Sequence, residues 1–305
     1  MAVHKRVYRP LAQAELTPRW SRFLVLPRFA AQGWRGSRLL SAFLVLCLLP
    51  SLAAAVVIYV FNTAVAQGLL GLGAGSSSTW SFRIDGQFFA IVSNIQGGLA
   101  FLLVAWVGPG LVAPDLVNNA LPLYLSRPFS RAEYVAGRVV TLLLLGSAIT
   151  WLPGLLLFAL QAGLAGEGWW HQNLHLAWGI VAGSLMWLTL LSLLALALSA
   201  WVRWRIVATG LFVGLFFVSA GLGEAFNQTL RTYWGKLLNL GYVITTIWKD
   251  LFHVVETERQ RRGEIGDPTL LDVPPGYCWL VLLAITGICL LLLTRRLRAR
   301  EVVRG

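Results

Sequence analysis

Six long apolar segments run along the chain, and polar stretches separate them. Each segment is close to the roughly 20 residues that a helix needs to cross a bilayer. The pattern predicts an all-α polytopic membrane protein with six transmembrane helices. Pro109 and Pro153 are expected to kink the second and third of them, because proline lacks the amide hydrogen that a helix uses. We expect the spans at residues 39–61, 88–112, 135–160, 176–201, 206–226 and 277–294.

Polar side chains interrupt the second predicted span at Ser93, Asn94 and Gln96. A polar group without a hydrogen-bond partner in lipid raises the free energy of the protein, so we expect these side chains to face other helices or a cavity. Bonding between helices is favoured over contact with a substrate. The cores of the predicted spans hold no acidic residue, which argues against a proton relay or an ion-coupled carrier.

Two apolar stripes at helical spacing occupy the long loop between the fifth and sixth spans, residues 227–276. They cover residues 230–238 and 244–255 and are too short and one-sided to span. The pattern predicts two short amphipathic helices lying shallowly at the outer membrane face, since so many large apolar residues do not stay exposed to water. A cover of this kind would act as an outer gate. Its candidate residues are Glu224, Trp234 and Trp248, with a solvated helix end as the alternative for Glu224.

The loop after the second span has the composition of an ordered connection. Residues 113–138 read APDLVNNALPLYLSRPFSRAEYVAGR. Pro114 is expected to end the second span and Asp115 to cap a short helix over residues 116–121. Ser130 and Glu133 match a capping box, which predicts that the third membrane helix begins near Arg131. The apolar face of the short helix suits docking to another protein, although a merely well-ordered connector fits the same residues.

The charges indicate how the chain sits in its membrane. Charged residues make up 12% of the 305 residues, against about 25% in soluble proteins, and the net charge is +12. Eighteen of the 25 Lys and Arg residues lie in the N-terminal segment, the loop after the second span, the turn after the fourth and the C-terminal tail. This bias predicts that both termini are cytoplasmic and explains the basic charge better than nucleic-acid binding does. Arginine and aromatic residues are interleaved over 17–35, which favours an interfacial helix there over a disordered basic tail.

Motifs for catalysis and metal binding are missing from the chain. It has no G-x-x-x-x-G-K-[ST] sequence, so we expect no ATP site on this chain, and H-E-x-x-H and G-x-S-x-G are absent too. Glu167, His171 and His175 share one helical face, but no fourth ligand accompanies them. The three cysteines have no CxxC spacing. We therefore expect no catalytic residue, no metal and no cofactor on this chain.

The loop resembles the first cytoplasmic loop of ABC-2-type permeases, the membrane-spanning subunits of ATP-binding cassette (ABC) exporters. Many members of that family have a glutamate and a Gly-Thr pair where this chain has Asp115 and Asn118-Asn119-Ala120. The C-terminal RRLRAREVVR also resembles the tail of one branch. The similarity touches most of the chain and is specific in the loop. Its matching residues are Asp115, Leu121, Leu125, Ser126, Arg127, Pro128, Ser130, Arg131, Glu133, Tyr134, Gly137 and Arg138.

The resemblance implies a permease subunit that pairs with a second copy, or with a homologous permease, in the bacterial cytoplasmic (inner) membrane. Two separate P-loop ATPase subunits, carrying ATP and Mg, would bind on the cytoplasmic side. The interfacial helix within the basic N-terminal segment, residues 1–38, would be the elbow helix of the family, and residues 39–305 would be the transmembrane domain. The loop over residues 113–134 would couple the ATPases to the second and third spans. The docking and coupling residues implied are Asp115, Leu116, Leu121, Leu123, Tyr124, Arg127, Arg131 and Glu133.

Two other classes of function fit a six-span chain: a stand-alone membrane channel and a polytopic membrane enzyme, both without an ATPase partner. An enzyme needs clustered acid, histidine or serine residues in or near the membrane, and the sequence offers no convincing cluster. A channel needs no ATPase. Whether a P-loop ATPase copurifies with the chain therefore separates the alternatives.

Overall fold

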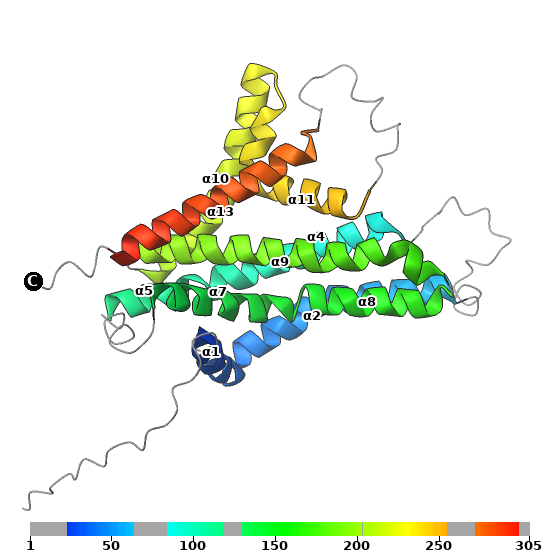
Figure 1. The fold of residues 1–305 in the computed structure, drawn as a ribbon, viewed down its shortest axis with the longest axis horizontal. Helices are drawn as coiled ribbons and strands as arrows, with labels where there is room; N and C mark the ends of the chain where they lie inside the picture. The colour runs from blue at the N-terminus through cyan, green and yellow to red at the C-terminus, as the bar shows by residue number, and fades with distance from the viewer. Residues whose placement is uncertain are drawn as a thin grey trace, which may run out of the picture.

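The six predicted spans are confirmed. A computed structural model describes residues 23–63, 84–118, 130–166, 168–202, 204–254 and 272–298, which are largely helical and contain no strand. Six helical segments within these ranges are long and apolar enough to cross a membrane (Figure 1). They are α2 (Arg38–Asn62), α4 with α5 (Gly86–Val107 and Pro109–Val117), α7 with α8 (Arg131–Ser147 and Trp151–Leu164), α9 (Trp169–Trp201), α10 (Arg205–Leu230) and α13 (Pro275–Arg298).

The second and third spans are each interrupted near the proline that was expected to kink them. The second span breaks at Gly108, directly before Pro109, and the third breaks over residues 148–150, shortly before Pro153. At the break in the third span, the Thr150 hydroxyl donates to the Gly146 carbonyl at 2.9 Å. Side-chain donors of this kind satisfy carbonyls that a broken helix leaves open in an apolar environment.

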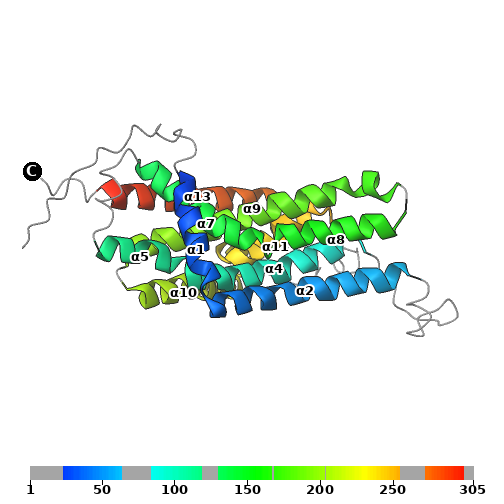
Figure 2. The ribbon, with the colours of Figure 1, turned by 90° about the horizontal axis from the view of Figure 1, so that it is seen from below.

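Helix α9 forms the centre of the bundle. Its most apolar stretch is 72% buried, whereas the corresponding stretch is 17% buried in α10 and 22% buried in each of α2 and α13. Helices α4, α5, α7, α8 and α13 pack against it, and the views in Figures 1 and 2 agree that it runs the length of the bundle. Many large apolar side chains on α2, α10 and α13 are exposed, as expected for faces that lipid or another protein covers in a membrane.

A short helix crosses the bundle near the N-terminus. Helix α1 (Val25–Arg35) begins later than the predicted residue 17, and residues 17–22 lie outside the described residues. It runs across α7 rather than along it (Figure 2). The contact needs a glycine, because a Cβ atom on Gly137 would come within 2.8 Å of both Leu26 Cδ1 and the Phe23 carbonyl. Its placement at the membrane interface stays a prediction.

The polar side chains of the second span face other helices, as predicted. Gln96 is buried and donates to the Ser51 hydroxyl on α2 at 2.6 Å. Asn94 donates to the Thr245 hydroxyl at 2.9 Å, and Ser93 is buried. These bonds join helices that are distant in sequence.

The prediction of two amphipathic helices between the fifth and sixth spans is half wrong. Helix α11 (Leu240–Leu251) forms the second. The first stripe instead contains the end of α10, a left-handed residue at Arg231, and a 3₁₀ turn, η2 (Trp234–Leu238). The chain folds back so tightly that a Cβ atom on Gly223 would lie 2.4 Å from the Gly235 carbonyl. The Gly235 amide also donates to Asn227 Oδ1 at 2.7 Å, which fixes η2 against α10.

A polar cluster holds η2, α11 and the segment directly before α13 together. The Tyr242 hydroxyl donates to Asp272 Oδ1 at 2.8 Å and accepts from the Val273 amide at 3.0 Å. Lys236 Nζ lies 3.6 Å from the same carboxylate oxygen. Burial, followed by the bond to Asp272, raises the pKa of the Tyr242 hydroxyl. Tyr242 therefore remains protonated and keeps donating at neutral pH.

Candidate functional site at the junction of α5 and α7

The candidate coupling residues separate into two groups. Asp115 lies near the end of α5, and Arg131 and Glu133 lie in the first turn of α7. The structure therefore brings the two ends of the predicted coupling loop side by side. Leu121, Leu123, Tyr124, Arg127 and the side chain of Leu116 lie outside the described residues.

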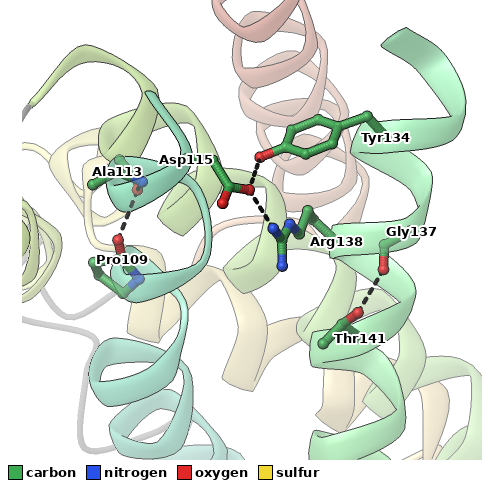
Figure 3. A network of polar contacts seen from close by, with 8 residues as sticks. Pro109, Ala113, Asp115, Tyr134, Gly137, Arg138 and Thr141 are labelled. Atoms are coloured by element: carbon green, nitrogen blue, oxygen red, sulfur yellow. Dashed lines mark hydrogen bonds and ion pairs between the residues drawn. The ribbon is translucent and has the colours of Figure 1, made fainter. Parts of the chain in front are cut away.

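Asp115 connects α5 to α7 through two side chains of α7 (Figure 3). The Tyr134 hydroxyl donates to Asp115 Oδ2 at 2.8 Å, and Arg138 Nη2 forms an ion pair with the same oxygen. The Arg138 guanidinium also lies 5.4 Å from the centre of the Tyr134 ring, within the range of a cation–π contact. We call Asp115, Tyr134 and Arg138 the latch.

The latch is mostly withdrawn from solvent. The side chains of Asp115 and Arg138 are 17% and 11% exposed, and Tyr134 is 1% exposed. A buried carboxylate needs a positive partner and further hydrogen bonds to offset its lost hydration, and Arg138 and Tyr134 supply both. Because Tyr134 and Arg138 are four residues apart on one helix, they present their polar groups to α5 from successive turns.

A second contact fixes α5 to the central helix. Ser199 of α9 is fully buried. Its hydroxyl accepts from the Ala113 amide at 2.9 Å and donates to the Pro109 carbonyl at 2.8 Å. Pro109 and Ala113 are one turn apart on α5 (Figure 3), so Ser199 bridges the two groups that a regular helix would pair directly.

Side chains of α10 donate hydrogen bonds to the backbone carbonyls at the break between α4 and α5. Pro109 has no amide hydrogen, which leaves the Ala105 carbonyl without its usual helical donor. The Thr209 hydroxyl donates to that carbonyl at 3.3 Å, and Arg205 Nη2 donates to the Trp106 carbonyl at 2.9 Å. Helix α5 is therefore bonded to α7 and α9, and the end of α4 directly before it is bonded to α10.

Two expectations about this loop are wrong. Pro114 does not end the second span, because α5 continues through it to Val117, and Asp115 is not the N-cap of a new helix. Pro114 is the sixth residue of α5, and its position removes a single helical bond. The contacts with Ser199 and Arg138 hold the helix in place around that gap. Of the helix expected over 116–121, residues 116 and 117 belong to α5, and residues 119–121 lie outside the described residues.

The predicted capping box is confirmed. The Glu133 amide donates to the Ser130 hydroxyl at 3.2 Å, and the Ser130 amide donates to Glu133 Oε2 at 2.6 Å. Helix α7 begins at Arg131, as expected. Glu133 thus fixes the point at which the chain enters the third span. Arg131 lines a groove on the other side of α7.

Arginine side chains gather where α5, the start of α7, the end of α9, the start of α10 and the end of α13 meet. We call this region the basic end of the bundle. Arg296 of α13 donates to the Ala200 carbonyl at 3.3 Å, and its guanidinium lies 5.3 Å from the centre of the Trp201 ring. Arg138, Arg205 and Arg295 belong to the same end. A cluster of arginines beside membrane helices is typical of a cytoplasmic face.

The three candidate gate residues do not form one site. Glu224 is exposed and accepts from the Gln228 side chain at 2.9 Å. Trp234 is 41% exposed and packs on Tyr233 and Tyr277. Trp248 is only 3% exposed and lies between α4 and α9. Its placement indicates a packing role.

Helix α11 therefore does not lie shallowly across the ends of the spans. A Cβ atom on Gly97 would lie 2.2 Å from Trp248 Cη2, and one on Gly183 would lie 2.7 Å from Trp248 Nε1. Gly97 is eleven residues past the start of α4, which is about 16 Å along the helix. Trp248 thus reaches deep between α4 and α9, into a slot that two glycines leave open.

Tyr134 and Arg138 match the loop motif, but the sequence did not connect either of them to Asp115, and it did not indicate Ser199. The available signal was a tyrosine and an arginine four residues apart on α7, with a single acid at the other end of the loop. Ser199 carries no comparable signal, because a serine in an apolar span is common glue between helices. Compared with known proteins, the chain matches no family model and no curated protein.

Proposed function

We propose that the chain is the permease subunit of an ABC exporter of the ABC-2 type, in the bacterial cytoplasmic (inner) membrane with both termini cytoplasmic. The six membrane-spanning helices support the transporter class. The resemblance of residues 113–138 to the coupling loop of that family supports the family.

The latch is the observation that carries the proposal. The loop leaves the bundle from α5 and returns through α7, and Asp115 bonds these two helices together. A partner that pushes on the loop would move the second and third spans as one body, which is how small displacements become rigid-body switches. Ser199 would pass the same displacement to α9, the centre of the bundle.

The partners follow from this arrangement. Two P-loop ATPase subunits, with their ATP and Mg, would bind the loop at the basic end, and a second copy or a homologous permease would complete the pathway. Leu121, Leu123 and Tyr124 supply the apolar surface of the loop. Purifying the chain from its native membrane and identifying a copurified P-loop ATPase tests the proposal.

Leu121→Asp should release the ATPase. A charge on the apolar docking surface would be buried without a partner, which costs several kcal/mol. We expect normal membrane insertion, loss of ATPase association and loss of ATP hydrolysis stimulated by the chain in proteoliposomes. Asn118→Asp is the matched control, because it adds the same charge at an exposed position. Full association of the Leu121→Asp variant would remove the loop from the coupling mechanism.

Residues 63–87 should lie outside the cytoplasm, as the distribution of Lys and Arg predicts. In intact cells, a membrane-impermeant thiol reagent should label Ser77→Cys. Gly305→Cys, in the C-terminal tail, should react only after permeabilisation. The three native cysteines are buried and should give little background. Labelling of Ser77→Cys only after permeabilisation would reverse the proposed orientation.

A further inference from the structure

A groove lies between α7, α9 and α13 at the basic end, on the side of α7 away from the latch. It has a volume of about 530 Å³, within the roughly 300–1,000 Å³ of small-molecule sites. Arg131, Ala132, Val135, Ala136 and Val139 of α7 form one wall, and Leu290, Leu293 and Thr294 of α13 form the other. Thr189 and Leu193 of α9 complete the lining.

The groove is open along its rim and apolar at its floor. Leu193 and Leu293 are 4% and 2% exposed. Ala132, Ala136 and Leu290 on the rim are exposed. The small side chains of the two alanines leave the space between the walls unfilled. Because α7 and α13 belong to membrane spans, the space along them adjoins the hydrocarbon of the bilayer rather than water.

The charge of the groove is confined to one end. Arg131 is the first residue of α7 and lies at the basic end. Thr294 lines the groove on α13, and the exposed Arg295 follows it directly. From Arg131 to Val139 the wall on α7 extends about 12 Å toward the middle of the bundle, and beyond Arg131 its lining residues carry no charge.

We propose that this groove binds one acyl chain of an anionic phospholipid, with the phosphate of the headgroup at Arg131. The apolar floor suits a hydrocarbon tail, and the guanidinium at the basic end suits a phosphodiester, as at other basic clusters beside membrane helices. Arg131 in the lining and the exposed Arg295 directly after Thr294 make this end of the groove positive, which complements the charge of an anionic headgroup. The inference requires only that the chain spans a membrane and does not depend on an ATPase partner.

Native mass spectrometry of the full chain, reconstituted with equal amounts of phosphatidylglycerol and phosphatidylcholine, tests the proposal. The wild-type chain should retain phosphatidylglycerol in preference to phosphatidylcholine. Ala136→Phe should fill the groove and abolish retention, whereas Ala53→Phe, the same change at an exposed position of α2, should leave retention unchanged. Arg131→Gln should lower the preference for phosphatidylglycerol about fivefold, the factor expected for one basic residue at an anionic headgroup.

Several results would overturn the proposal. They are equal retention of the two lipids by the wild-type chain, undiminished retention by Ala136→Phe, and an unaltered preference in Arg131→Gln. A cross-link from position 136 to a second copy of the chain would show that protein, not lipid, occupies the groove. If Ala136→Phe does not elute as a single species, Ala132→Phe fills the same groove from one turn earlier and replaces it.

Discussion

Asp115→Ala should destabilise the protein strongly and uncouple the loop from the spans. The substitution leaves the guanidinium of Arg138 buried beside Tyr134 without its carboxylate partner. Removing one member of a buried ion pair costs about 3 kcal/mol or more, because the remaining charge stays desolvated. We expect a lower melting temperature in detergent and, in the assembled transporter, ATP hydrolysis that no longer responds to the permease.

A double-mutant cycle separates the ion pair from general damage at the site. Arg138→Leu alone should also destabilise the protein, but Asp115→Ala with Arg138→Leu should cost much less than the two single changes together. Tyr134→Phe is the mild control, because it removes one hydrogen bond worth about 1 kcal/mol and keeps the ring. Strict additivity of Asp115→Ala and Arg138→Leu would show that the latch does not act as a unit.

Trp248→Ala should reduce stability by about 3 kcal/mol, because it leaves a cavity between α4 and α9. This expectation replaces the sequence-based one, in which Trp248 was a candidate residue of the outer gate. Gly97→Ala should destabilise as well, since its Cβ atom would lie 2.2 Å from the Trp248 ring. In the double variant, the alanine at position 97 occupies part of the vacated space, so the two effects should fall short of additive.

Two further tryptophan variants test whether the loss of buried packing at Trp248 causes the destabilisation. Trp248→Phe should be tolerated better than Trp248→Ala, because the ring is retained and the indole nitrogen has no hydrogen-bond partner among the described residues. Trp234→Ala removes a side chain that is 41% exposed and should cost far less stability. Unfolding in detergent, followed by tryptophan fluorescence, measures all five variants. Equal losses for Trp234→Ala and Trp248→Ala would contradict the packing role of Trp248.

The spans and helix starts were predictable because their causes are local in the sequence. Runs of apolar residues predict the six spans, and Pro109 and Pro153 lie close to the observed interruptions of the second and third spans. The capping box of Ser130 and Glu133 depends on residues three apart, so the sequence alone was sufficient to find it.

The role of Asp115 could not be predicted in the same way. An aspartate after a proline is a good N-cap by local rules. Its bonds go instead to Tyr134 and Arg138, which are 19 and 23 residues further along the chain. The continuation of α5 through Pro114 likewise depends on contacts with α9 and α7 that the loop sequence does not contain.

The prediction of an α-helix over residues 230–238 was also wrong because contacts with another part of the chain decide the structure there. Its spacing fits an α-helix, but the close approach of Gly223 and Gly235 and the bond from the Gly235 amide to Asn227 favour a tight reversal. The second stripe was correctly predicted to be helical. Its depth was not predictable, because the slot that receives Trp248 is made by Gly97 and Gly183 on two other helices.

Site-specific photo-crosslinking from the coupling loop tests the central proposal most directly. A photoreactive amino acid is placed at Leu121, Leu123 or Tyr124 in the full chain, in its native membrane, and at Ser77 as the control on the opposite side. We expect cross-links from the three loop positions to a P-loop ATPase and none from position 77. Loop positions that cross-link to no ATPase, in membranes where the chain is folded and abundant, would contradict the assignment as an ABC permease subunit.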